Sequence, residues 1–440
     1  MDHAPWFEAP DQFDQRRIRL ADIDGSGTMD IIYLAHDGVH LYFNQSGNAW
    51  SEPETVAAFP PVDDLGAVQA LDLLGNGTAC LVWSSPLPGD AGHSMRYIDL
   101  MGGEKPHLLV RSRNNLGAET RVFYSPSTKF YLADRRAGRP WITRLPFPVH
   151  VVEHVETYDW VSRNRFVTRY AYHHGFYDGV EREFRGFGMV EQWDTEELGA
   201  LSAGGVFPEA LNIDAASYVP PALTKTWFHT GAFLEEGKIS RQFEHEYYRE
   251  SDLSEGIPGL TDADFEAMLV PDTQLPDDLA NGEVREACRS LKGAILRQEV
   301  YAQDGTDAED RPYSVSEPNY TIRRVQPLGA NRHAVFFTHA RETIDFHYER
   351  ELYDIGGLRL ADPRVSHTMT LAVDDYGNPL QSVAIGYGRR HDDPHPLLTA
   401  DDRDRQRSSP PIARAITRIP FCRTTRTALR SRARPGPTNC

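Results

Sequence analysis

A strand–turn–strand unit occurs twice in this sequence, about 50 residues apart, and such a repeat limits the folds that the chain can adopt. Residues 67–83 align with residues 17–33, and the alignment superimposes the Asp, Gly and Thr residues of the two turns. Short apolar runs separated by Asp/Gly turns are typical of an antiparallel meander. Because about four such strands fit within one period, the repeat predicts blades of a β-propeller. Two blades cannot close a ring, so we expect residues 1–95 to be the C-terminal blades of a larger propeller.

Most of the remaining chain also has the period of β-strands. Residues 165–172 alternate polar and apolar side chains, and residues 368–385 do the same on both sides of a turn. Residues 260–291 are the one region with helical signals, because a polar cap and acidic first-turn residues precede an amphipathic run. The sequence therefore predicts a mostly-β chain with a short helical insertion near residues 260–291.

The charge of the chain restricts its partners. The 440 residues carry 46 Lys and Arg against 64 Asp and Glu, a net charge of −18. Residues 401–440 contain ten Arg and three Asp, a net charge of +7, which leaves −25 for residues 1–400. Nucleic acids bind proteins through Lys and Arg, so the acidic body argues against a nucleic-acid partner. We also expect no Cys-based zinc site, no membrane span and no cleavable signal peptide.

The first of the two turns is a candidate metal site. Counted from Asp22, oxygen-bearing side chains occupy positions 1, 3, 5 and 9 of this turn, and a backbone carbonyl is expected at position 7. This pattern suits Ca²⁺, because calcium accepts carboxylate, hydroxyl and carbonyl oxygens together. The alternative is a metal-free turn in which Asp and Ser bond the local backbone. The second turn has Leu74 and Cys80 where the first has acids, so we interpret it as metal-free. The candidate calcium ligands are Asp22, Asp24, Ser26, Thr28 and Asp30.

Two other groups of titratable residues have simpler explanations. His173 and His174 are adjacent, and neighbouring residues of a strand point to opposite faces, so we interpret them as histidines that flank a turn at a strand end. Glu244–Glu246 lacks the second His of a metalloprotease helix and is interpreted as a solvated strand face. The sequence contains no nucleophile elbow, phosphate loop or dinucleotide fingerprint. We therefore predict a protein that is not an enzyme.

Several segments resemble one known family. Residues 170–188, which include Glu-Arg-Glu-Phe-Arg-Gly-Phe-Gly, closely resemble the middle region of the B component of bacterial insecticidal toxin complexes. The Asp22–Asp30 turn is similar to the FG-GAP/VCBS-type propeller blades of that family. Residues 291–301 and 373–379 look like its next middle region. The resemblance covers residues 15–405.

The resemblance implies a scaffold rather than a catalyst. By that likeness, residues 96–222 form the first part of a shell of RHS-like β-strands, and residues 223–405 continue this shell and carry the helical insertion. The family's C component completes the shell and supplies the enclosed toxic enzyme, and its pore-forming A component binds the propeller, which acts as the gate. The resemblance also implies a secreted complex whose parts are cytoplasmic before release.

Two other functions remain open from the residues alone. One is a free-standing, calcium-dependent adhesion or carbohydrate-binding propeller. The other is a glycosidase that uses a pair of the many carboxylates. Sugar binding in calcium would favour the first, and glycan hydrolysis that is lost on substitution of one carboxylate would favour the second.

Residues 406–440 differ in composition from the rest of the chain. They form an Arg-, Thr- and Pro-containing segment with no periodic pattern. One interpretation is a basic arm for acidic partners. We favour the other, out-of-frame translation from a position near residue 407, and reading the other two frames of the coding DNA tests it.

Overall fold

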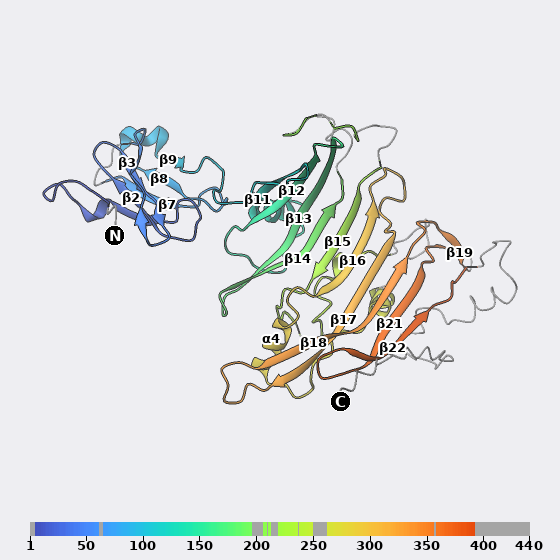
Figure 1. Ribbon diagram of the computed structural model, residues 1–440. Helices are drawn as coiled ribbons and strands as arrows, with labels where there is room; N and C mark the ends of the chain where they lie inside the picture. The colour runs from blue at the N-terminus through green and yellow to red at the C-terminus, as the bar shows by residue number, and fades with distance from the viewer. Residues whose placement is uncertain are drawn as a thin grey trace, which may run out of the picture.

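Two small antiparallel sheets precede one large sheet along the chain (Figure 1). This computed structural model describes residues 5–60, 65–195, 206–208, 210–212, 219–235, 237–249, 262–355 and 358–391. The tail expected to be atypical, residues 406–440, lies outside these ranges.

The small sheets are meanders, as the repeat predicts. The first has four strands in the order β1-β2-β3-β6, and the second has three in the order β7-β8-β9. Their bounds are β1 Ile18–Ala21, β2 Asp30–Leu34, β3 Val39–Tyr42, β6 Glu54–Val56, β7 Ala67–Leu71, β8 Cys80–Ser84 and β9 Met95–Asp99. A separate two-stranded sheet pairs β4 (Asn44–Gln45) with β5 (Ala49–Trp50), and the short 3-10 helices η1 (Gln15–Arg17) and η2 (Pro88–His93) flank these strands.

One apolar core joins the two small sheets. Ile32 and Leu34 of β2 are fully buried in the same cluster as Leu81 and Trp83 of β8. Because each small sheet has too few strands to bury its own apolar face, the two units stabilise each other through this shared core. The closed ring of a propeller stays a prediction.

The large sheet confirms the mostly-β fold. Eleven strands lie in the order β10 to β18 and then β21 and β22, each antiparallel to its neighbours. Their bounds are β10 Arg111–Arg113, β11 Ala118–Pro126, β12 His150–Asp159, β13 Asn164–Asp178, β14 Glu183–Trp193, β15 Ala222–Phe228, β16 Ile295–Ala302, β17 Ser314–Gln326, β18 Val335–His347, β21 Arg364–Val373 and β22 Pro379–Gly386. The hairpin β19 (Tyr353–Ile355) and β20 (Leu358–Leu360) forms a sheet of its own.

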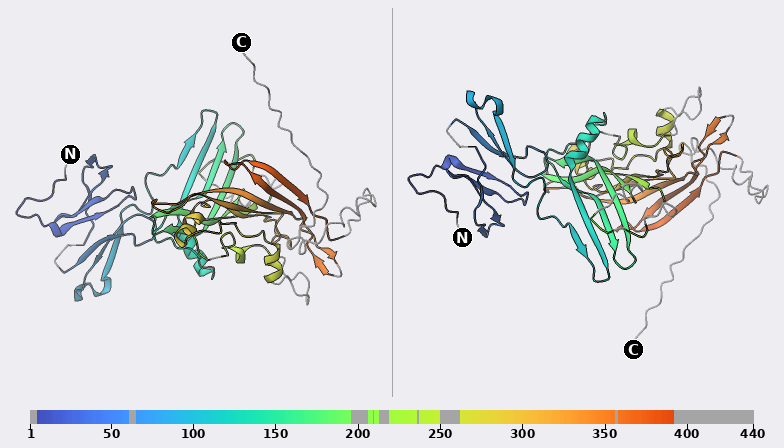
Figure 2. Two further views of the ribbon diagram at one scale, coloured as in Figure 1. Left: turned by 90° about the horizontal axis from the view of Figure 1, so that it is seen from below. Right: turned by 90° about the horizontal axis from the view of Figure 1, so that it is seen from above.

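The helices lie on one side of the large sheet (Figure 2). Two are the predicted ones, α3 (Asp262–Met268) and α4 (Asn281–Arg289). The expectation that the 260–291 region holds the only helices is wrong, because α1 (Ser127–Arg136) lies between β11 and β12. Phe130 and Asp134, four residues apart on one helical face, are both buried, so packing on β13 stabilises a segment whose aromatic and Arg content suggests a strand.

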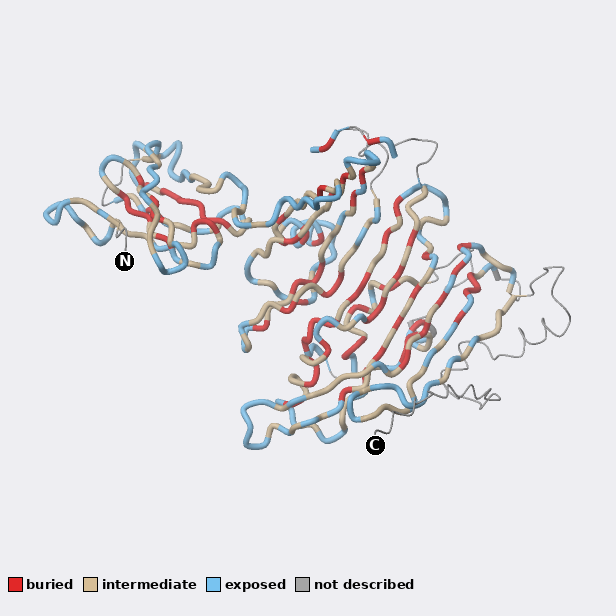
Figure 3. Tube along the Cα trace, in the orientation of Figure 1, coloured by how far each residue is buried: buried red, intermediate tan, exposed pale blue. Residues whose placement is uncertain are grey.

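The covered face of the large sheet buries every second residue (Figure 3). In β16, Arg297, Glu299 and Tyr301 are buried, whereas Gln298 and Val300 between them are half-buried. Strand pleating places alternate side chains on opposite faces, so the insertion between β15 and β16 covers one face only. None of the helices in the described ranges has the length and apolar character to cross a membrane.

Candidate functional sites

The first turn brings its three acids together. Asp22 follows β1, Asp30 begins β2, and carboxylate oxygens of Asp22, Asp24 and Asp30 lie within 4.8 Å of one another. The hydroxyls of Ser26 and Thr28 lie 2.9 Å apart and bond each other. The backbone N–H of Ser26 donates to both Asp22 and Asp24, at 3.0 Å and 2.9 Å. The charge and spacing of the three acids fit a hard cation. The hydrogen bonds from the Ser26 N–H are equally those expected of a turn that holds no metal ion.

The pKa values of Asp30 and Asp24 are shifted in opposite directions. Burial raises the pKa of Asp30, and the charges of Asp24 and Asp22 add to this increase although Asn44 donates a backbone N–H to its carboxylate. Burial also opposes ionisation of Asp24, but hydrogen bonds from His107 and Ser26 lower its pKa overall. A positive charge in this turn is therefore favourable.

The second turn holds its backbone without a cluster of acids. Asp72 accepts the backbone N–H groups of Asn76 and Gly77 at 3.0 Å and 2.9 Å. The side-chain oxygen of Asn76 in turn accepts from Thr78. These are the bonds of a local polar turn.

The first turn contacts the segment that leads into the large sheet, and the second turn contacts α1, which lies between β11 and β12. Lys105 donates to the carbonyl of Gly25 at 2.5 Å, and the His107 ring lies 2.9 Å from Asp24. At the second turn, the Thr128 hydroxyl at the start of α1 donates to the carbonyl of Gly75 at 2.7 Å. The turns thus connect the small sheets to the large one, a role that the sequence did not indicate.

The two adjacent histidines lie inside β13 rather than at a strand end, so that expectation is wrong. His174 has φ +55°, next to an irregularity in the β13–β14 register. The rings bind different carboxylates, with His173 2.5 Å from Asp134 and His174 2.7 Å from Glu246. Glu246 belongs to the 3-10 helix η3 (Glu244–Glu246), not to a solvated strand face, and also accepts from Trp227.

His173 is held in its charged form. Burial by itself lowers the pKa of His173, but the carboxylates of Asp134 and Glu191 outweigh this and raise it to about 9. Burial opposes ionisation of Asp134, but hydrogen bonds from His173 and Trp141 lower its pKa overall. The pair is therefore a buried ion pair at neutral pH.

A second buried ionic cluster joins the insertion to the sheet. Arg297 donates to Glu299 of the same strand and to Glu317 of β17, each at 2.6 Å. The two carboxylates also accept backbone N–H groups of the insertion, from Tyr248 and Val270, both at 2.9 Å. Although burial disfavours its charge, the two glutamates raise the pKa of Arg297. The charges of this cluster neutralise one another, and its hydrogen bonds hold the insertion on the sheet.

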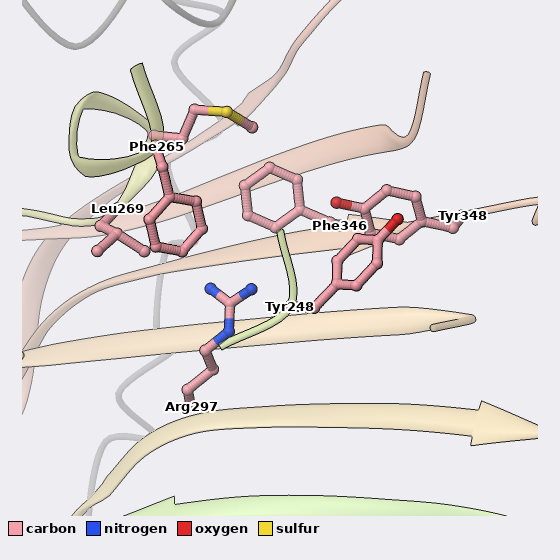
Figure 4. A pocket seen from close by; sticks show the side chains of 7 residues that line it. Tyr248, Phe265, Leu269, Arg297, Phe346 and Tyr348 are labelled. Carbon is pink, nitrogen blue, oxygen red and sulfur yellow. The ribbon is translucent and has the colours of Figure 1, made fainter. Parts of the chain in front are cut away.

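A small aromatic pocket lies beside this cluster (Figure 4). Arg297 points toward Phe265 and Leu269, while Tyr248 and Tyr348 meet edge to face with ring centroids 5.8 Å apart. The side chains that line it are Tyr248, Phe265, Met268, Leu269, Arg297, Phe346 and Tyr348. They come from the insertion, β16 and the β18 region, so this pocket belongs to the packing of the insertion on the sheet.

The ionic clusters were not predicted from the sequence, because charged residues at strand period are expected to face water. The sequence does carry a signal for a buried cluster, because strand period places Arg297 and Glu299 on the same face as the aromatic Tyr301. In the structure, Glu299 accepts a hydrogen bond from the Tyr301 hydroxyl at 2.6 Å. Nothing in the sequence indicates that the insertion covers this face.

Two models of one protein family match the chain. The model described as the middle/N-terminal region of the insecticide toxin TcdB matches residues 43–231, and the middle/C-terminal region of the same toxin matches residues 286–417. Together they cover more than half of the chain. The second match ends ten residues beyond position 407. A comparison with curated protein sequences finds no match.

Solved structures with the same fold come from toxin complexes. A crystal structure of TcdB2-TccC3 is similar, with 31% sequence identity and a TM-score of 0.69, over 90% of this chain and 18% of that chain. The TcdB2-TccC3-Cdc42 structure has 31% identity and a TM-score of 0.69, over 89% and 17%. The Photorhabdus luminescens Tc holotoxin pore has 32% identity and a TM-score of 0.69, over 90% and 17%. The chain thus spans less than one fifth of the length of these relatives.

Proposed function

Since the chain belongs to the TcdB family, the B components of insecticidal toxin complexes, we propose that it forms part of a propeller gate and of a shell that encloses and delivers a partner toxic enzyme. The small sheets would supply blades of the gate, and the large sheet would supply shell wall. The partners would be a C component, which completes the shell, and a pore-forming A component, which binds the propeller. The complex would act outside the producing cell after assembly in its cytoplasm.

The single observation that carries this proposal is the continuous sheet of eleven strands, which matches TcdB2 in complexes with TccC3. A shell wall needs a wide sheet whose successive strands pair without interruption, and the strand order here is sequential across both matched regions. The buried ion pairs of Asp134 and His173, and of Arg297 with its glutamates, are engaged in packing, which supports a scaffold rather than a catalyst.

A transplant experiment tests the shell proposal. Residues 43–391 of this chain replace the matching segment of TcdB2, and the chimera is co-expressed with TccC3. We expect co-purification and protection of the TccC3 C-terminal region from added protease, as with unaltered TcdB2. A folded chimera that binds no TccC3, or leaves it as accessible to protease as free TccC3, would contradict the proposal.

We further propose that the first turn binds Ca²⁺. Asp22, Asp24 and Asp30 would supply carboxylate ligands, with the hydroxyl of Ser26 and the backbone carbonyl of Thr28 as further oxygen ligands. The clustering of the acids and the raised pKa of Asp30 support a cation at this position.

Calorimetric titration of the chain with Ca²⁺ tests this site. We expect Asp30→Asn to weaken binding at least about tenfold, because the ion loses a charged ligand. Asp72→Asn in the second turn is the matched control and leaves binding unchanged. Equal binding by both variants would place the ion elsewhere, and no heat with the unaltered chain would favour the metal-free turn.

A further inference from the structure

The helix α1 lies between the small sheets and the large sheet. In its first turn, the Thr128 hydroxyl donates to the Gly75 carbonyl of the second turn at 2.7 Å. One turn further along, Phe130 is buried on β13, where its ring meets that of Tyr172 edge to face with centroids 5.7 Å apart. Whatever holds α1 on the large sheet therefore also holds the second turn in place.

A buried histidine joins α1 to two strands of the sheet. Nδ1 of His173 in β13 lies 2.5 Å from a carboxylate oxygen of Asp134 in α1, and Nε2 lies 3.5 Å from a carboxylate oxygen of Glu191 in β14. A neutral imidazole carries one N–H, so one of its two nitrogens would direct a lone pair at a carboxylate. Only the protonated ring presents an N–H to both acids.

Two other cations face these acids. Arg139 lies 3.4 Å from Asp134, and Lys225 of β15 lies 3.7 Å from Glu191. Arg139 is 66% exposed, so water screens its charge. Neither ion pair joins α1 to β14, and this link therefore depends on the charge of His173.

We propose that the proton on His173 switches the junction between the small sheets and the large sheet. While the ring is charged, α1 stays on β13 and β14, and its first turn holds the second turn of the small sheets. When the proton is lost in alkaline solution, α1 separates from the large sheet and releases that turn.

The pH range of this switch follows from the surroundings of the ring. Burial lowers the pKa of His173, but the two carboxylates outweigh it and raise the pKa from 6.5 to about 9. The bridge thus stabilises the junction fully below pH 6.5, and its contribution is lost as the pH rises to 9. His150, which packs against Gly77 of the second turn, does not interfere, because burial lowers its pKa and keeps it neutral in this range.

Hydrogen exchange of the full chain between pH 6.5 and 9 tests the switch, after correction for the intrinsic pH dependence of exchange. We expect the protection of the α1 amides to fall by up to about tenfold per pH unit, because one proton is released on opening. The amides of Asn76 and Gly77 in the second turn should lose protection over the same range. The amides of β18, far from His173 in the strand order, should keep theirs.

Two glutamine variants separate the bridge from the general charge of the helix. Glu191→Gln removes one of the two charges that hold the proton, so the fall in protection should begin about one pH unit lower. Glu153→Gln is the matched control, because Glu153 pairs with Lys129 of α1, and it should leave the pH of opening unchanged.

Each of four results would overturn the proposal. Constant protection of α1 up to pH 9 would show that the charge of His173 does not hold the helix. Loss of protection in α1 alone would show that the helix does not hold the second turn. An equal fall in β18 would mean that the whole chain unfolds, and equal shifts by the two glutamine variants would remove the bridge as the cause.

Discussion

The small sheets and the large sheet are held together by different chemistry. The small sheets share an apolar core, in which Ile32 and Leu81 are fully buried. On its covered face the large sheet buries ion pairs as well, among them Arg297 with Glu299. Apolar contacts are non-directional, whereas a buried charge requires its partner in one position. The insertion is therefore fixed on the large sheet by position-specific bonds, whereas the stability of the small sheets depends on the apolar area that they bury.

The largest expected effect is at the buried arginine. Arg297→Met leaves Glu299 and Glu317 buried without their cation, which is expected to lower the free energy of unfolding by about 3–5 kcal/mol. Denaturant unfolding of the full chain measures it. Arg323→Met, at a side chain 43% exposed, is the control and should cost less than about 1 kcal/mol. If both variants lose the same free energy of unfolding, the buried cluster does not stabilise the sheet more than an exposed arginine does.

In the small sheets, an apolar truncation should be nearly as costly. Leu81→Ala removes a fully buried side chain from the shared core and is expected to cost about 3 kcal/mol. Hydrogen exchange of the β8 amides reports this region, since β8 contributes Leu81 and Trp83 to the same cluster. If the free energy of unfolding of the large sheet falls by the same amount, the two regions unfold as one unit and are not stabilised separately.

The ion pairs predict a pH dependence that the apolar core lacks. His173 has a pKa of about 9 in the folded chain against 6.5 for an ordinary histidine. A raised pKa stabilises the fold fully below pH 6.5, and this contribution is lost as the pH rises to 9. The expected loss is at most about 3 kcal/mol, measured by unfolding at a series of pH values.

Asp134→Asn tests the cause of this dependence. The amide keeps a hydrogen-bond acceptor for His173 but removes the negative charge. We expect the loss of stability between pH 6.5 and 9 to shrink. An unchanged pH profile would assign the dependence to other groups.

The smallest effect is expected where the two regions meet. Thr128→Val removes the hydroxyl that donates to the Gly75 carbonyl and should cost about 1 kcal/mol. Thr168→Val in β13, a half-buried threonine away from this contact, is the control. Hydrogen exchange in the second turn should rise in the first variant only, and the same rise in both would remove Thr128 from the junction.

Local patterns predicted the strands and two helices well. The Asp/Gly turns predicted the meanders, and the pattern of a cap and acidic residues in the sequence predicted α3, because these signals act within a few residues. The helix α1 was missed because its stability comes from Phe130 and Asp134 packed on β13, and isolated short helices are marginal. The acid cluster of the first turn was found because its residues are close in the sequence.

The strand period, the paired turns, the acids at positions 22, 24 and 30 and the family of the chain can thus be read from the sequence. Which face of the large sheet is covered becomes known from the packing of the folded chain, and with it that Arg297, Glu317 and His173 are buried rather than solvated. The reason is physical, since strand period fixes which residues share a face but not what packs against it. That choice depends on contacts between segments far apart in the chain.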